Sequence, residues 1–210
     1  MNPVFPSGAT LIDRNEAAGL IPAHITLQSQ LNEYEAANIL SAQEWLATRR
    51  RGDPLNSKFL HTVHRKMFDK TWKWAGKARR TDKNIGGPWF EVPTKLHQLL
   101  GDVRAQVEYR AYPALELATR YHHRLVAIHV FPNGNGRHAR IMADLLLQQL
   151  TGERFTWGEG KALPLSELRS TYIHALREAD AGDYLPLLRF VQSGAPLTRD
   201  APASCRAPDP

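Results

Sequence analysis

The sequence predicts a mainly α-helical fold, a helical bundle that carries one small β-hairpin. Apolar residues recur every three to five positions through most of the chain, which is the spacing of amphipathic helices. Only residues 79–93 break this period and alternate in strand fashion. With 210 residues, 42% of them hydrophobic and 23% charged, the chain can form one domain with a sizeable core. Collagen-like, fibrous and disordered classes are excluded.

The expected elements follow one another in a simple order. Residues 1–25 combine several Pro and Gly residues, so we expect an irregular leader that docks on the body. A first helix is expected over residues 26–49, because Thr26 can serve as its N-cap and no Gly or Pro interrupts it. Residues 194–210 are rich in Pro and are expected to form a disordered tail. Further helices are expected over residues 57–70, 94–109, 114–128, 136–150, 164–179 and 184–192.

The expected hairpin lies between two of these helices. Ile85, Gly86, Gly87 and Pro88 favour a turn. Residues 89–92 then alternate as a half-buried strand does.

Charge, cysteine content and hydropathy limit the kinds of ligand, metal site and location that we expect for this protein. The formal net charge is +6, and basic residues gather in 49–51 and 66–83. A solvated surface explains this best, although DNA or another phosphate-rich ligand would fit. Cys205 is the single cysteine, which excludes an intramolecular disulfide and a cysteine metal site. Because no apolar run reaches the roughly 18 residues of a membrane span and residues 1–14 lack a signal-peptide pattern, we expect a cytoplasmic protein without a membrane partner.

Residues 129–140, His-Val-Phe-Pro-Asn-Gly-Asn-Gly-Arg-His-Ala-Arg, carry the chemistry. The Asn-Gly-Asn-Gly run allows positive φ angles, so successive backbone N–H groups can converge on an anion. The helix that follows directs its positive N-terminal end to the same place. Arg137 and Arg140 are three residues apart, on one helix face, and both can reach a polyphosphate there. The segment therefore predicts a phosphate site.

His129 precedes this loop, where an imidazole could take a proton from an incoming hydroxyl. The competing interpretation is a hydrogen-bonded core histidine. His122, His123 and His138 could be offered as metal ligands, but no HExxH-type spacing supports a zinc site.

Residues 129–140 resemble the signature of the Fic/Doc family, His-x-Phe-x-(Asp/Glu)-Gly-Asn-Gly-Arg-x-x-Arg, with one departure. Trp-Ala-Gly at 74–76, the expected hairpin and Gly-Asp-Tyr at 182–184 agree with the family as well. The resemblance covers residues 26–193, and the closer likeness is to the bacterial group labelled mobile mystery protein B. It implies a Fic-like helical bundle in which the hairpin serves as a flap.

The resemblance implies a protein adenylyltransferase, which activates a Ser, Thr or Tyr hydroxyl of a target protein to attack the α-phosphate of ATP. His129 is then the base. The backbone of residues 134–136 and the Asn135 side chain are expected to hold the α and β phosphates, Arg137 the β and Arg140 the γ phosphate. The implied nucleotide-binding set is Phe131, Asn133, Gly134, Asn135, Gly136, Arg137 and Arg140. The implied flap set, which would align the target peptide by strand addition, is Lys83, Asn84, Ile85, Gly86 and Gly87.

The departure is Asn133, which stands where most family members have the Asp or Glu that holds Mg²⁺. An amide oxygen is a neutral ligand, so we expect Mg²⁺ to bind weakly there. Transfer of another phosphate-containing group, or an inactive copy, stays open. Relatives that move such groups alter the Gly-Asn-Gly portion, which is intact here, and this favours nucleotidyl transfer.

Many relatives restrain the site with a helix of pattern Ser/Thr-x-x-x-Glu-Gly/Asn. Ser29 and Glu33 match it within residues 26–50, whereas Tyr34 departs from its last position. The resemblance then implies that Glu33 pairs with Arg140, and the alternative is a solvated helix face. A toxin-like protein held by an antitoxin, a non-catalytic module that binds phosphate or nucleic acid, and a homo-oligomer stay open, while the target protein is unknown.

Overall fold

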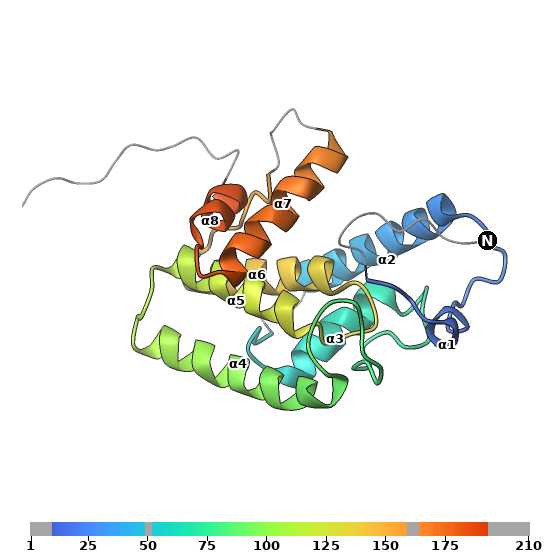
Figure 1. The fold of residues 1–210 in the computed structure, drawn as a ribbon, viewed down its shortest axis with the longest axis horizontal. Coiled ribbons are helices and arrows are strands. Elements are labelled where there is room, and N and C mark those ends of the chain that lie inside the picture. Colours follow the sequence, from blue (N-terminus) through green and yellow to red (C-terminus); the bar gives the residue numbers. More distant parts are fainter. Residues whose placement is uncertain (1–9, 49–51, 159–163, 193–210) are drawn as a thin grey trace, which may run out of the picture.

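The computed structural model describes residues 10–48, 52–158 and 164–192, and in them the chain is a helical bundle (Figure 1). The predicted mainly α fold is confirmed. The helices are α1 (Arg14–Ala17), α2 (Gln28–Thr48), α3 (Ser57–Phe68), α4 (Val92–Glu108), α5 (Ala114–Ile128), α6 (Asn135–Thr151), α7 (Leu165–Asp180) and α8 (Leu185–Gln192), with a 3₁₀ turn, η1 (Trp89–Glu91). The expected tail at 194–210 and the basic run at 49–51 lie outside the described residues.

Helix α5 occupies the centre, packing against α4, α6 and α8 (Figure 1). Helix α3 packs against α2, α4 and α6. The core between them is closed by large side chains with almost no exposed surface, such as Phe68, Tyr121, Met142 and Phe190. Burial of these apolar faces is the main force that holds the bundle together. The loop between α5 and α6 is thereby fixed at both ends.

The helix ends follow local chemistry. Asn56 caps α3 by accepting a hydrogen bond from the backbone N–H of Phe59 at 3.1 Å. Gly152 ends α6 in the left-handed conformation that glycine adopts without strain. The predicted ranges agree with the observed helices to within a few residues. For α3 to α8 the reason is a clear apolar period, whereas α2 has almost none.

The expected hairpin at 79–93 is wrong, since the described residues contain no strand and only an isolated bridge between Leu20 and Trp72. Side chains form hydrogen bonds with the backbone of this segment, in place of the hydrogen bonds between paired strands. Arg79 donates to the carbonyls of Thr81 and Gly87, and the Asp82 carboxylate accepts from the N–H of Trp89 at 2.8 Å. The segment is therefore a loop followed by η1, and we keep the name flap for residues 83–87.

The leader from residue 10 onward contacts the body and, instead of being irregular throughout, contains a short helix, α1. Asp13 and Glu16 form a capping box at its start. The indole N–H of Trp74 donates to the carbonyl of Glu16 at 3.2 Å, and the N–H of Lys73 donates to the carbonyl of Gly19 at 2.9 Å. The leader is thus attached directly after α3.

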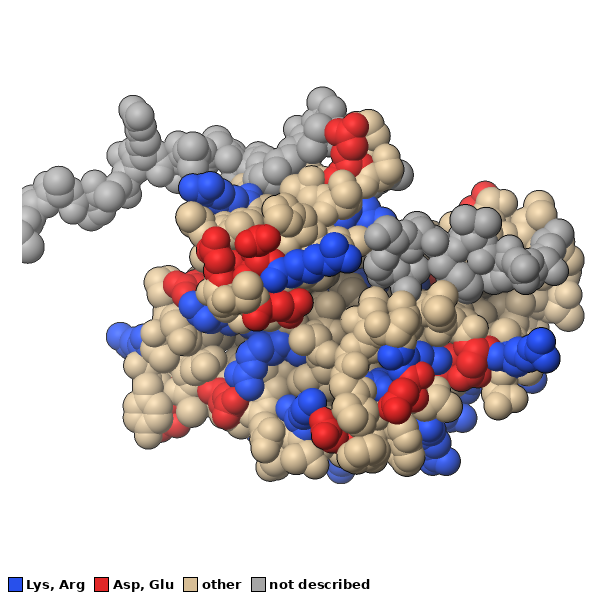
Figure 2. Space-filling view, in the orientation of Figure 1, with Lys and Arg blue, Asp and Glu red and all other residues tan. Residues whose placement is uncertain are grey.

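None of the helices in the described residues is both long enough and apolar enough to cross a membrane. Figure 2 shows Lys and Arg side chains interspersed with Asp and Glu over the visible face. On that face, the positive net charge is not concentrated in one patch.

Candidate active site

His129 lies at the junction of α5 and the loop that leads to α6. It ends α5 in the left-handed conformation, with φ 57° and ψ 60°, and its side chain is buried. Its ring Nδ1 lies 3.3 Å from the carbonyl oxygen of Val126. Because a carbonyl can only accept, Nδ1 carries the ring proton and Nε2 has the free lone pair. The ring is held in the tautomer that a general base needs.

The environment of His129 disfavours its charged form. Burial lowers the pKa of its imidazole to about 4, and the nearby charges of Arg79 and Lys83 add to this effect. The Arg79 guanidinium also donates from Nε to the backbone carbonyl of His129 at 2.7 Å. The imidazole is therefore neutral at pH 7, with Nε2 able to accept a proton.

The partner of Nε2 is Thr10, a leader residue that no sequence pattern indicates. The hydroxyl oxygen of Thr10 lies 2.7 Å from Nε2, and the residue is only 9% exposed. A lone pair at Nε2 requires that the hydroxyl donates. No local sequence signal could have found this contact, because the two residues are 119 positions apart.

The loop after His129 is held by its own side chains. The Phe131 ring is fully buried and stacks on His64, with 3.6 Å between ring centroids. The Asn135 amide accepts from the N–H of Phe131 at 2.9 Å and donates to its carbonyl at 2.8 Å. Both side chains therefore shape the loop, and neither faces outward. Their place in the nucleotide-binding set stays a prediction.

The backbone of the loop leaves N–H groups open at the start of α6. Gly134 has φ 78°, and a Cβ there would lie 2.5 Å from the Phe68 ring, so only glycine fits. Helix α6 begins directly afterwards, and the first-turn N–H groups of Asn135, Gly136 and Arg137 have no partner within the helix. These groups and the helix dipole favour an anion at this end.

Asn133 connects the loop to the leader. Its side-chain oxygen accepts from the N–H of Gly134 at 2.6 Å, and its side-chain N–H donates to the carbonyl of Thr10 at 3.2 Å. Its own carbonyl accepts from Nε2 of His64 at 3.1 Å. The oxygen expected to bind Mg²⁺ is thus already engaged with the backbone, although it retains a second lone pair.

The two motif arginines are in different surroundings. Arg137 donates to the carboxylate of Glu35 on α2 at 2.6 Å, and the other oxygen of that buried carboxylate accepts from the indole N–H of Trp72 at 2.7 Å. Arg140 lies over the ring of Tyr172 on α7, 4.3 Å from its centroid. The site residues thus receive contacts from both ends of the chain.

The expected Glu33–Arg140 pair is wrong. Ser29 and Glu33 are exposed on α2, and no ion pair of Glu33 occurs within the described ranges. The carboxylate that reaches the motif is Glu35, two residues further along, and its partner is Arg137.

The flap surrounds His129 and the leader. Gly86 has φ 91°, and a Cβ there would lie 2.7 Å from Cβ of His129. The side chains of Lys83 and Asn84 both bind the leader. Ile85 is half-buried, and the Gly87 carbonyl is bound by Arg79. Gly86 of the flap therefore lies beside His129, Lys83 and Asn84 contact the leader, and the flap forms no strand.

The other three histidines considered as metal ligands each form hydrogen bonds with different partners. His122 bonds to the Tyr172 hydroxyl at 2.9 Å, His138 donates to the Leu60 carbonyl at 3.0 Å, and His123 bonds to Tyr184 and Asp180. In the described part of the chain, no three His, Cys, Asp or Glu side chains gather as a metal site.

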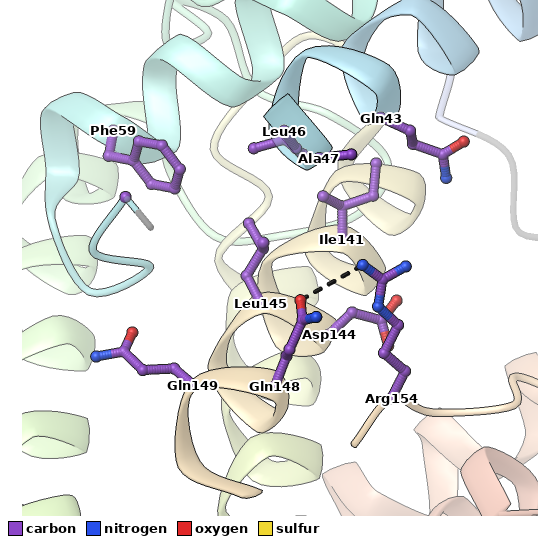
Figure 3. A pocket seen from close by; sticks show the side chains of 11 residues that line it. Gln43, Leu46, Ala47, Phe59, Ile141, Asp144, Leu145, Gln148, Gln149 and Arg154 are labelled. Carbon is purple, nitrogen blue, oxygen red and sulfur yellow. Dashed lines mark hydrogen bonds between the residues drawn. The ribbon is translucent and has the colours of Figure 1, made fainter. Parts of the chain in front are cut away.

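A separate pocket of about 350 Å³ lies away from His129, between the end of α2, the start of α3 and the outer face of α6 (Figure 3). Its walls include Leu46, Phe59, Ile141 and Asp144, and Arg154 donates to Gln148 across it at 3.4 Å. Asp144 is engaged by the indole N–H of Trp157 and the N–H of Phe155. The motif contributes none of its side chains to this pocket.

The similarity to known proteins includes the loop and the helices on either side of it. The pattern of the Fic/DOC family matches residues 54–147. A protein named protein adenylyltransferase Fic from Culex quinquefasciatus is 28% identical over 155 residues, which are 71% of this chain and 29% of that protein. Its namesake from Drosophila willistoni is 34% identical over 129 residues, 60% of this chain and 24% of that protein. The chain spans about a quarter of the length of these relatives.

Solved structures share the fold. The N-terminal FIC domain of the Bep8 effector protein from Bartonella sp. 1-1C has a TM-score of 0.67 at 14% identity, covering 88% of this chain and 97% of that one. The BepC protein of Bartonella tribocorum, solved with bound AMPPNP, has a TM-score of 0.63 at 17% identity, covering 86% and 97%.

Proposed function

We propose that the chain, which matches the Fic/DOC family pattern over residues 54–147, is a protein adenylyltransferase that transfers AMP from ATP to a hydroxyl side chain of a protein. The observation that carries this proposal is the hydroxyl hydrogen-bonded to Nε2 of a neutral, fixed His129. The relatives with about 30% identity that bear the adenylyltransferase name support the choice of AMP.

In the proposed reaction, His129 acts as general base. The acceptor oxygen attacks the α-phosphorus of ATP, and the bond from that phosphorus to the oxygen bridging to the β-phosphate breaks. Nε2 takes the hydroxyl proton, and pyrophosphate leaves. The open N–H groups at the start of α6 would bind phosphate oxygens, and Arg137 and Arg140 would bind the β and γ phosphates. For Arg137 this requires release from Glu35.

Magnesium is a proposed companion of ATP. The protein offers the side-chain oxygen of Asn133 as a ligand, and this oxygen is neutral and already accepts one hydrogen bond. Mg²⁺ binds through carboxylates and substrate phosphates, so these residues fit it only together with the phosphates of ATP. When bound, the ion would reduce the negative charge on those phosphates.

We also propose that α2 restrains the site, through Glu35 rather than Glu33. The carboxylate of Glu35 binds the guanidinium that a phosphate would otherwise occupy, at 2.6 Å. A site open to ATP would modify proteins without control, so a restraint within the chain reduces the need for an antitoxin partner. A toxin-like role and a cytoplasmic location, where ATP and target proteins are available, belong to the same proposal.

The proposal predicts the effect of removing the base. His129→Ala is expected to lower transfer of label from ATP carrying ³²P at its α-phosphate by about 100- to 10,000-fold, because it removes the general base. His129→Asn is the matched variant, since Asn tolerates the left-handed conformation of this position. Circular dichroism should show folded protein for His129→Asn.

A binding module without catalysis predicts a different result. Such a protein would label nothing in a lysate in its wild-type form, and His129→Asn would leave its affinity for phosphate or DNA unchanged. Equal label transfer by wild type and His129→Asn would rule out the proposed role of His129.

A further inference from the structure

We propose that Thr10 is a self-modification site, whose hydroxyl accepts AMP in the active site of its own chain. This inference rests on the proposed adenylyl transfer and goes beyond it by naming one acceptor. It starts from the contact between the Thr10 hydroxyl and Nε2 of His129, at 2.7 Å.

The geometry at Thr10 is that of an acceptor and its base. Nδ1 of His129 donates to the Val126 carbonyl, so Nε2 can only accept, and the Thr10 hydroxyl is its donor. A general base must lie within about 2.6–3.2 Å of the group it deprotonates, and this pair meets the condition. The hydroxyl proton is therefore already directed to the atom that would take it.

The backbone around Thr10 is held by flap and motif residues. Asn133 donates to the carbonyl of Thr10 at 3.2 Å. The N–H of Leu11 donates to the side-chain oxygen of Asn84 at 3.1 Å, and Lys83 donates to the carbonyl of Leu11 at 3.3 Å. Residues 10 and 11 thus lie beside the flap, where the family resemblance implies that a target peptide binds.

The next turn of the leader fixes this position from the C-terminal side. Lys83 forms ion pairs with Glu16 and, at 3.5 Å, with Asp13. The Thr81 hydroxyl donates to the carboxylate of Asp13 at 3.2 Å. A segment held in this way presents its hydroxyl at a high effective concentration, which favours reaction within the chain over reaction between chains.

The step balances as an adenylyl transfer. Thr10 Oγ1 forms a bond to the α-phosphorus of ATP, the bond to the pyrophosphate oxygen breaks, and the proton passes to Nε2 of His129. The products are a phosphodiester between Thr10 and AMP, and pyrophosphate. Once esterified, Oγ1 has no proton to donate, so the hydrogen bond that joins the leader to the base is lost.

The experiment incubates the full chain with Mg²⁺ and ATP labelled at the α-phosphate, then maps adenylate by mass spectrometry of peptides. Wild type is expected to carry adenylate on Thr10. Thr10→Val, which keeps the shape without the hydroxyl, should lose this label, and Thr10→Ser should retain it. Thr81→Val is the matched control, because it removes a hydroxyl that contacts the same leader but not His129.

A second arm tests reaction within one chain. Active Thr10→Val is mixed with His129→Asn, so that label on Thr10 can arise only between chains. With micromolar protein against an effective concentration of about millimolar, this labelling should be about 100-fold or more slower than in wild type. Equal rates in the mixture and in wild type would overturn modification within the chain.

Lysate proteins added to the same reactions report the proposed function separately. Labelled lysate proteins with an unmodified Thr10 in wild type would overturn the inference and leave the proposed function standing. If neither Thr10 nor any lysate protein is labelled, both the inference and the proposed function are overturned. The inference is supported if adenylate is found on Thr10 in wild type and in Thr81→Val, and if the same peptide of Thr10→Val carries none.

Discussion

At the scale of single residues, His129 and Asn133 both contact Thr10, one through its hydroxyl and the other through its carbonyl. Asn133 can do this because an amide offers a donor and an acceptor at once, and its oxygen is bound by the N–H of Gly134. A carboxylate at this position has acceptors only. The residue that departs from the family pattern is thus one of those that hold the leader.

Asn133→Asp is therefore expected to loosen the leader. It keeps the acceptor for the N–H of Gly134, loses the donor to the Thr10 carbonyl and places two oxygens against each other. Loss of one hydrogen bond, about 1 kcal/mol, corresponds to roughly fivefold more frequent opening. Hydrogen exchange at the amide of Leu11, measured without nucleotide, should become faster by this factor.

The same variant should strengthen the Mg²⁺ dependence of ATP binding, because a carboxylate adds a charged ligand. A titration of ATP binding with Mg²⁺, repeated in the presence of a chelator, measures this change. An unaltered exchange rate at Leu11 would contradict the role of Asn133 in holding the leader, and an unaltered Mg²⁺ titration would show that the side chain does not meet the ion.

Phe131 and Asn135 show what a motif tells about single residues. The pattern identifies the segment that forms the loop, and Gly86 of the flap lies against His129 in the structure. It does not separate side chains that contact a ligand from those that fold back on the loop. The two hydrogen bonds between Asn135 and the backbone of Phe131 depend on the three-dimensional path of the loop, which residue spacing does not determine.

At the scale of elements, the sequence predicts where the helices begin and end, but it does not predict which side chains form contacts between elements. Helices α3 to α8 follow from apolar periodicity and from caps such as Asn56. The flap was mistaken for a hairpin because alternation at 89–92 resembles a strand, whereas Arg79 and Asp82 bind its backbone from the side. On α2, Glu33 and Glu35 are separated by about 200° around the helix axis, so a short pattern can select the wrong face.

The contact between α2 and α6 gives a prediction at this scale. Glu35→Gln keeps an oxygen for the indole N–H of Trp72 but removes the charge that holds Arg137. With Arg137 released to phosphate, ATP should bind more tightly by about 1 kcal/mol, roughly fivefold, since the Arg137 side chain is partly exposed. Isothermal titration with ATP measures the change.

Glu33→Gln is the matched control, because it makes the same chemical change on an exposed face of the same helix. Its ATP affinity should equal that of wild type. If Glu35→Gln also binds ATP as wild type does, Glu35 does not compete with the nucleotide for Arg137, and restraint by a separate partner becomes the better proposal.

At the scale of the whole molecule, the bundle buries several histidines near its centre. Burial lowers the pKa of His122 and of His138 to about 3 and that of His129 to about 4, and it lowers the pKa of His64 well below its usual value. The rings of His122, His129 and His138 are therefore neutral in the folded protein at pH 5. In the unfolded chain, a histidine has a pKa near 6.5 and is charged at that pH.

The sign of the pH dependence follows from proton binding. Between pH 6.5 and pH 4 the unfolded chain binds protons that the folded protein does not, so the free energy of unfolding falls as the pH falls. Each such ring contributes a slope of up to about 1.4 kcal/mol per pH unit. Asp144 acts in the opposite direction, because burial raises the pKa of its carboxyl to about 6 and the folded protein then binds the proton first.

The three rings of His122, His129 and His138 bind about three more protons in the unfolded chain, and Asp144 binds about one more in the folded protein. The net difference of about two protons gives a limiting slope of about 2.7 kcal/mol per pH unit near pH 5, and burial of His64 acts in the same direction. Since most domains are stable by only about 5–15 kcal/mol, the protein should unfold between about pH 5 and pH 4.

Urea unfolding followed by tryptophan fluorescence at pH 7.5, 6.5 and 5.5 measures the slope. His138→Asn removes one buried ring and should reduce the slope near pH 5 by about 1.4 kcal/mol per pH unit. A free energy of unfolding that stays constant from pH 7.5 to pH 5 would show that these rings accept protons without unfolding, and hence that the core around α5 and α6 opens to water at low cost.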